Sequence, residues 1–258
     1  MNKKFIFISI ISIFIAGGIA YSGGLLKHFG FEEKDALNEW KEKVFHGRVL
    51  YEVAKDQGKG FLFAKSQKAA SGLFYTISYS PKSFPYISWN WKVSKFPSKN
   101  YPEVVSKKSW IERDDYALRF YVIFPSFIFT NTKCLEYIWS EDLSKDTVLT
   151  SPFFSNIKLV VLESGSEKIT QWRSEERNLY EDYRRAFGRY PPGRVGALAL
   201  MTDSDNTQSS AEAAYADIKV GYEKALMSPP EIRKIEAFKP KKKKQGFFEY
   251  VKEKLGIR

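Results

Sequence analysis

The feature that most constrains the fold is a series of short apolar segments in which every second side chain is of the same kind. In residues 114–124, Leu118, Phe120 and Val122 fall on one side, whereas Arg119 and Tyr121 fall on the other. A period of two residues is typical of a strand with two different faces. The same reasoning predicts strands at 47–54, 60–66, 71–79, 85–93, 133–140, 157–164, 194–202 and 213–222.

Helical patterns are few. Residues 179–188 predict a short helix that ends at Gly188, and residues 35–43 predict another that leads into the domain. Strands that do not alternate with regular helices disfavour a doubly wound α/β fold. We therefore predict an all-β protein, an antiparallel β-sandwich of the jelly-roll type, with the helix near 179–188 and with helical termini.

The N-terminal end has the pattern of an export signal. Lys3 and Lys4 precede an uncharged apolar run that extends to Tyr21. Residues 1–22 are either a signal peptide, cleaved before Gly23, or a retained signal anchor. Both alternatives predict a periplasmic domain or one at the outer face of the inner membrane. A linker would follow at 23–43, and the sandwich would span 44–225.

The positive charge is concentrated outside the predicted sandwich. The chain has a formal net charge of +11, to which residues 228–258 contribute ten Lys and Arg against four Glu. A nucleic-acid-binding core would carry such charge on its folded surface, so this distribution argues against nucleic acid as a partner.

The basic tail, residues 226–258, ends in a segment with Phe247, Phe248, Val251 and Leu255 at helical spacing. A short amphipathic helix fits this pattern. Two interpretations are open, namely contact with an anionic membrane surface and a solvated tail.

The first candidate site lies in the strand at 114–124. Asp115, Arg119 and Tyr121 share one side by parity, and charge inside an apolar strand must be paired. They would form a groove in which Arg119 recognises an anionic or hydroxylated ligand, an internal ion pair, or a solvated face of the sheet.

The second candidate is the oxygen-rich segment Asp203, Asp205, Asn206 and Thr207. Alternating oxygen side chains suit a hard cation such as Ca²⁺, which is the one cofactor that the sequence suggests. Direct contact with a ligand and a turn held by local hydrogen bonds are the other interpretations.

Aromatic and sulfur residues divide between core and surface. Trp89 and Trp91 alternate with polar residues and are predicted to be core, whereas Trp139, at a strand end, is predicted to be exposed and to contact a ligand. The single cysteine, Cys134, is predicted to be a small buried side chain. The pair Glu175 and Glu176 is predicted to belong to a charged linker and helix face, with general acid–base work as the alternative.

A set of segments in a fixed order resembles a bacterial family of unknown function, the domain of unknown function 3047 family. The segments are Ala70–Leu73, Pro85–Trp91, Asp114–Ala117, Tyr137–Trp139, Gln171–Trp172, Arg177, Asp182–Gly188, Met201–Thr207 and Ala214–Ile218. The resemblance implies an exported domain with the shape of galactose-binding and carbohydrate-binding modules, and it implies no activity. It also suggests Asp217 as a ligand of a structural Ca²⁺. The tryptophan pair of the family brackets an arginine, where this chain has Asn90.

Three functions remain open at this stage. The first is a non-enzymatic binding domain of the cell envelope for a saccharide or envelope glycan. The second is a hydrolase or lyase that acts on an envelope polymer through Asp115, Arg119 and Tyr121. The third is an envelope scaffold protein that docks partners through its sheet edges or its tail.

Overall fold

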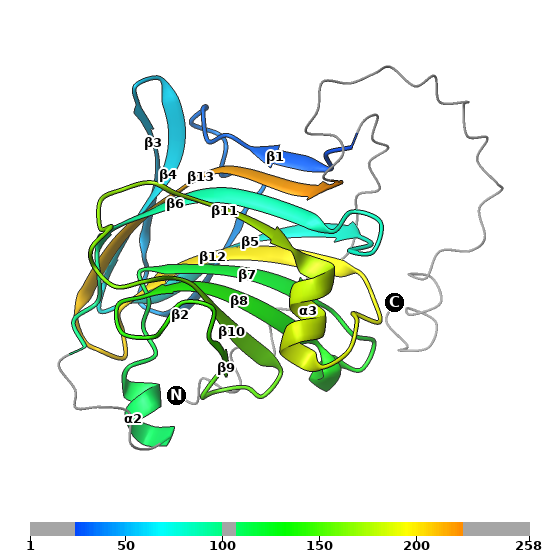
Figure 1. Ribbon diagram of the computed structural model, residues 1–258. Helices are drawn as coiled ribbons and strands as arrows, with labels where there is room; N and C mark the ends of the chain where they lie inside the picture. Colours follow the sequence, from blue (N-terminus) through cyan, green and yellow to red (C-terminus); the bar gives the residue numbers. More distant parts are fainter. Residues whose placement is uncertain (1–23, 100–106, 224–258) are drawn as a thin grey trace, which may run out of the picture. The chain divides into compact units, whose positions relative to one another are not determined.

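The alternating segments form two β-sheets stacked face to face in the computed structural model, which describes residues 24–99 and 107–223 (Figure 1). The predicted β-sandwich is therefore confirmed. The predicted signal at 1–22, the tail and its helix, and hence the helical termini, lie outside the described residues. Within the described ranges, no helix is long and apolar enough to cross a membrane.

The first sheet has six strands in the order β11-β6-β13-β4-β3, and β1 pairs with β13. Its strands are β1 (Lys27–Phe29), β3 (Leu50–Asp56), β4 (Lys59–Gln67), β6 (Tyr86–Lys95), β11 (Arg173–Asn178) and β13 (Ser210–Tyr222). All their pairings are antiparallel.

The second sheet has seven strands in the order β2-β5-β12-β7-β8-β10-β9. Its strands are β2 (Lys41–His46), β5 (Ala70–Tyr79), β7 (Leu118–Phe124), β8 (Lys133–Ser140), β9 (Val148–Thr150), β10 (Ile157–Ser164) and β12 (Val195–Asp203). One pair, β8 with β10, is parallel, and the others are antiparallel. Every predicted strand is present in one of the two sheets.

The helix predicted at 35–43 is wrong. Residues 33–39 form successive turns, in which the amide of Ala36 donates to Glu33 and that of Asn38 donates to Asp35. Strand β2 begins at Lys41 because the chain pairs there with β5. Trp40, which is buried against Phe29 and Tyr75, fixes the end of the turns.

The short helical elements are α2 (Lys107–Glu112), η2 (Phe129–Asn131) and α3 (Leu179–Phe187). Helix α3 confirms the prediction for 179–188, and Gly188 ends it with a φ of 72°, in the left-handed region that glycine tolerates. Asp182 accepts hydrogen bonds from Arg177 of β11 at 2.8 and 2.6 Å and from the hydroxyl of Tyr137 of β8 at 2.7 Å. These contacts join the helix to both sheets.

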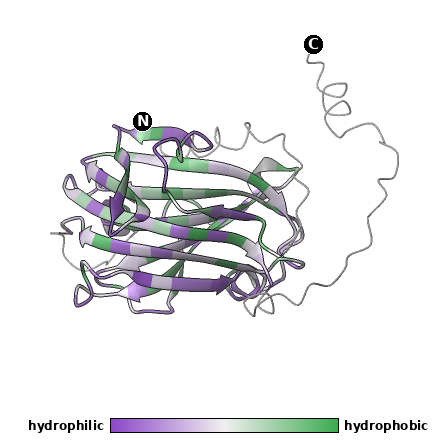
Figure 2. Ribbon diagram, turned by 90° about the horizontal axis from the view of Figure 1, so that it is seen from above, coloured by the Kyte–Doolittle hydropathy of each residue, from purple (hydrophilic) through white to green (hydrophobic). Residues whose placement is uncertain are grey.

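The core between the sheets is rich in aromatic rings. Trp89 and Trp91 are buried, as predicted, and so is Cys134. Trp89 of β6 stacks on Phe120 of β7 with ring centroids 4.4 Å apart, and it also contacts Tyr137 of β8 at 5.3 Å. Hydrophobic residues alternate with hydrophilic ones along the strands (Figure 2).

Candidate functional site

Strand β7 has two buried faces. Leu118, Phe120 and Val122 belong to the core between the sheets, whereas Tyr121 and Ile123 belong to a second apolar cluster. Side chains alternate across a strand, so this second cluster lies on the outer face of the seven-stranded sheet. Residues of the loops around β9, among them Leu143 and Phe154, pack against it. Arg119 shares the parity of Tyr121 and is carried to the same outer face.

The Arg119 guanidinium is 4% exposed and is surrounded by acceptors. Its Nε donates to Asp203 Oδ1 at 2.8 Å, and its Nη1 donates to Glu136 Oε1 at 2.7 Å. Nη1 also reaches the hydroxyl of Tyr121 at 3.3 Å. Nη2 donates to the backbone carbonyl of Asp114 and lies 3.6 Å from its Oδ2. These partners come from β7, β8, the end of β12 and the segment before β7.

These buried charges form one side of a recess in the outer face of the seven-stranded sheet. The recess has about 690 Å³ free of protein atoms, including open space at its mouth. We call its buried charged residues the charged floor: Asp114, Arg119, Glu136 and Asp203. We call its half-buried rings the aromatic wall: Phe45, Phe74, Phe153 and Phe154. Tyr121, Ile123 and Met201 complete the apolar lining.

The charged floor contains more acids than bases. Burial raises the pKa of Glu136, and the charge of Arg119 opposes that rise. Burial also raises the pKa of Asp203 well above its usual value, and the neighbouring Asp115 and Asp205 add to the rise. The ring of Tyr116 lies 4.7 Å from Arg119 Cζ and 4.1 Å from Lys99 Nζ, measured to the ring centroid. Two cations therefore lie against one aromatic ring beside the floor.

The predicted trio of Asp115, Arg119 and Tyr121 is only partly assembled. Arg119 and Tyr121 are neighbours, but Asp115 does not share their face, because β7 begins only at Leu118 and the parity breaks in the residues before it. Asp115 instead accepts hydrogen bonds from the Thr207 amide at 2.6 Å, the Thr207 hydroxyl at 2.7 Å and the Asn206 amide at 3.2 Å. The residue beside Arg119 is Asp114, and not Asp115 as the alternation predicted.

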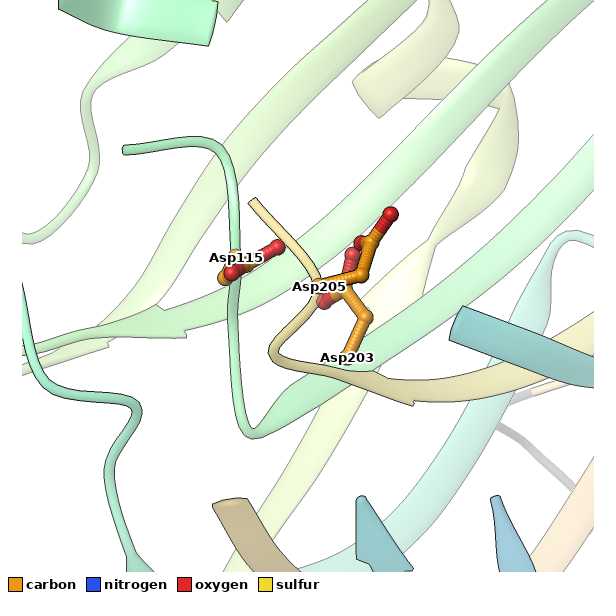
Figure 3. Close-up of side chains that lie close together, drawn as sticks. All are labelled: Asp115, Asp203 and Asp205. Atoms are coloured by element: carbon orange, nitrogen blue, oxygen red, sulfur yellow. The ribbon is translucent and has the colours of Figure 1, made fainter. Parts of the chain in front are cut away.

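The segment from Asp203 to Thr207 leaves the end of β12 and is held by Asp115 and by the bond from the Asn206 amide group to the carbonyl of Asp114 at 3.1 Å. The side chains of Asp115, Asp203 and Asp205 lie close together (Figure 3), with oxygen atoms within 4.8 Å of one another. Carboxylate oxygens are the donors that Ca²⁺ prefers. Asp115 also accepts a bond from the loop, and Asp203 accepts bonds from Arg119 and from the Tyr116 amide.

Two other predicted site residues lie elsewhere. Trp139 was predicted to be exposed, and this prediction is wrong because the side chain is fully buried. Its indole N–H donates to the Gly165 carbonyl at 3.1 Å. Its parity in β8 is that of the core residues Leu135 and Tyr137. Asp217 pairs with His28 at 2.7 Å and with Lys219 at 2.8 Å. Among the described residues, the three acids that could share one ion do not include it.

Sequence reasoning missed Glu136 and the aromatic wall. Glu136 had a usable signal, because it lies between the buried Cys134 and Ile138 in an otherwise apolar strand. An acid at such a position needs a partner, and Arg119 is the matching base on the strand that β8 pairs with. Phe153 and Phe154 lie between β9 and β10, where no periodicity gives a direction.

Glu175 of β11 is a second perturbed acid, outside the recess. It accepts a bond from the Trp91 indole at 3.2 Å, and burial, followed by the nearby Glu163, raises its pKa to about 7. We expect an NMR titration of its carboxyl carbon to have a midpoint near 7. The folded protein then keeps a proton that the unfolded chain releases, so stability falls as pH rises from about 4.5 to about 7.

The variant Glu175→Gln should lose that part of the pH dependence, and Glu176→Gln on the same strand is its matched control. A midpoint close to the usual 4.5 would contradict the assignment.

Comparison with known proteins gives one family match. A family model described as "Protein of unknown function (DUF3047)" matches residues 38–219, which include the charged floor and the aromatic wall. No curated protein matches the chain in sequence.

Several solved structures are similar at low sequence identity. The family 11 carbohydrate-binding module of a Clostridium thermocellum cellulase has 11% identity and a TM-score of 0.39, over 72% of this chain and 88% of that one. A variant derived from the Cel12A cellulase of Rhodothermus marinus has 9% identity and a TM-score of 0.42, over 72% of this chain and 97% of that one.

Proposed function

The chain belongs to the DUF3047 family of proteins of unknown function, and we propose that it is a non-enzymatic binding domain whose ligand is a saccharide such as an envelope glycan. The observation that carries the proposal is the recess, which combines half-buried aromatic rings with a buried set of hydrogen-bonding charges. Clefts of this kind, apolar with a few converging polar groups, are the usual form of a small-ligand site.

The two parts of the recess suit the two kinds of surface on a sugar. Aromatic faces pack against the apolar C–H faces of a pyranose ring. The carboxylates of Glu136 and Asp203 are acceptors for hydroxyl groups, and both line the recess. The ring of Phe74 and those of Phe153 and Phe154 come from different parts of the chain and are placed on one site by β5 and the β9–β10 loop.

Binding without turnover is supported over the hydrolase or lyase alternative by the state of the predicted catalytic trio. Asp115 is turned into the loop and bonded to Thr207, away from Arg119 and Tyr121. Arg119 is itself engaged by Asp203 and Glu136. Incubation of the protein with envelope glycans, followed by analysis of the products, should therefore show no change in chain length.

The proposal is tested by calorimetric titration of the protein with a panel of oligosaccharides. We expect Phe74→Ala to weaken binding by about fivefold, because one stacked ring contributes on the order of 1 kcal/mol. The matched control is Phe61→Ala on β4 of the other sheet, where Phe61 contacts Trp172 at a ring distance of 5.8 Å. Absence of binding to every saccharide, or equal losses in both variants, would refute the recess as a saccharide site.

We also propose the location that the N-terminal pattern predicts, the periplasm or the outer face of the inner membrane. A fusion to a reporter that is active only outside the cytoplasm tests it, with a fusion that lacks residues 1–22 as control. Contact of the tail with an anionic membrane surface is likewise a proposal, which removal of residues 228–258 tests through vesicle sedimentation.

A further inference from the structure

Most N–H donors of the Arg119 side chain are bonded to other groups of the protein. Its Nε–H is bonded to Asp203, and its two Nη groups are bonded to Glu136, Tyr121 and the carbonyl of Asp114. The Nη2 group also faces the Asp114 carboxylate at 3.6 Å. A guanidinium has five N–H donors, and four of them make hydrogen bonds within the protein. Arg119 therefore has little hydrogen-bonding capacity left for a ligand carboxylate, and its recognition of an anionic or hydroxylated ligand stays a prediction.

The charge of the floor favours a cationic ligand instead. Three carboxylates, those of Asp114, Glu136 and Asp203, surround a single guanidinium, and each of these residues is at most 4% exposed. Lys99, the other cation against the Tyr116 ring, is paired with Glu141 at 3.2 Å. A buried excess of acidic groups is stabilised by one more positive charge.

The aromatic wall favours the same kind of group. Cations are attracted to the faces of aromatic rings, and the attraction is stronger where water is excluded. The rings of Phe45, Phe74, Phe153 and Phe154 line the same recess as the acids. An ammonium group in the recess would have both the aromatic rings and the carboxylates as neighbours. A ligand carboxylate would not be attracted to the faces of the rings, and it would lie beside the acids Glu136 and Asp203.

We propose that the recess selects a ligand that carries an ammonium group, and that the saccharide is therefore an amino sugar with a free amine. The inference rests on the proposed function and names the class of saccharide that the same site takes. Glu136 is the residue that we expect to set this preference, since it lines the recess and is joined to the floor by one bond to Arg119.

The test is calorimetric titration of the full chain with four oligosaccharides of equal length, built from glucosamine, N-acetylglucosamine, glucose and a uronic acid. The buffer is kept slightly acidic so that the free amines are protonated. We expect the glucosamine oligomer to bind about tenfold more tightly than the acetylated and neutral ones, equivalent to about 1.4 kcal/mol. The uronic acid oligomer should bind most weakly.

The variant Glu136→Gln keeps an acceptor for Arg119 and should lose the preference for the amine while it still binds sugar. The control Glu175→Gln replaces a half-buried acid of the other sheet and should keep the preference. Circular dichroism and thermal unfolding of each variant establish that it is folded.

Each outcome decides between the two proposals. Equal binding of the glucosamine and glucose oligomers overturns the amine preference and leaves the saccharide site standing. Tighter binding of the uronic acid also overturns it. If no oligomer binds, the proposed function fails and the inference with it. A further titration uses CaCl₂ alone, and Ca²⁺ that binds with dependence on Glu136 and displaces the amine would overturn the inference in favour of a metal.

Discussion

Replacement of Arg119 by methionine is expected to destabilise the protein by about 3–5 kcal/mol, the usual consequence of removing one partner from a buried ion pair. Methionine fills much of the same volume, so the loss reports on charge and not on a cavity. It leaves Glu136 and Asp203 buried without the guanidinium that bonds both of them. Equilibrium unfolding in denaturant measures the change.

The loss should depend on pH in a definite direction. Burial raises the pKa values of Glu136 and Asp203, and Arg119 lowers both. Each acid then keeps its proton in the folded state at a pH at which the unfolded chain has released it, so stability falls as pH rises. Without Arg119 these pKa values rise further. The gap between wild type and variant is therefore smallest in acid and widens with increasing pH.

Two companion variants make this result specific. Arg184→Met removes an exposed arginine that pairs with Glu181 at 2.8 Å, and it should leave stability nearly unchanged. Adding Glu136→Gln and Asp203→Asn to Arg119→Met should restore part of the lost stability, because neighbouring substitutions are coupled. A loss that is independent of pH, or that the added substitutions deepen, would contradict an origin in uncompensated charge.

Replacement of Trp89 by alanine should also cost about 3–5 kcal/mol, the range for truncating a buried tryptophan. Trp89 is 1% exposed and stacks on Phe120 of the facing sheet at an interplanar angle of 12°. It contacts Trp91 of its own strand as well, at 5.4 Å. The substitution would open a cavity between the two sheets, and equilibrium unfolding again measures the loss.

The control for Trp89 is Trp172→Ala. Trp172 is 36% exposed and contacts Phe61 and Lys92 at the surface of the six-stranded sheet. We expect a loss below about 1 kcal/mol there. Equal losses at the two tryptophans would mean that the stacking between the sheets contributes little.

The sequence predicted the strands well because their burial is periodic. The alternation of Leu118, Phe120 and Val122 with Arg119 and Tyr121 marks β7 and gives the correct face for each of these residues. It could not show that β10 pairs with β8 in parallel, since period and composition are alike for the two directions on a buried strand. The wrong helix prediction at 35–43 has a similar cause, because a series of turns and a short helix can have the same pattern of polar and apolar residues.

The candidate site was predictable only in part. Arg119, Tyr121 and Asp203 were identified from polar residues inside or beside apolar strands, and they do meet in the recess. Asp115 was assigned to the wrong face because parity holds only while the strand is regular, and β7 starts after it. Trp139 was taken for a surface residue because it is near a strand end, but the neighbouring loop covers it and accepts its indole N–H.

The contacts of Arg119 also have a consequence for the order in which the chain can fold. Arg119 and its partners lie 17 residues apart for Glu136, 84 for Asp203 and 96 for Tyr215, whose hydroxyl accepts from the Arg119 amide. Contacts that close such long loops form late, because the loss of chain entropy precedes the gain. During synthesis, β7 and β8 exist before β12 and β13 have been made. Arg119 can then pair with Glu136 but not yet with Asp203, which belongs to β12. The recess therefore acquires its final balance of charges only when the last strands have joined the sheets.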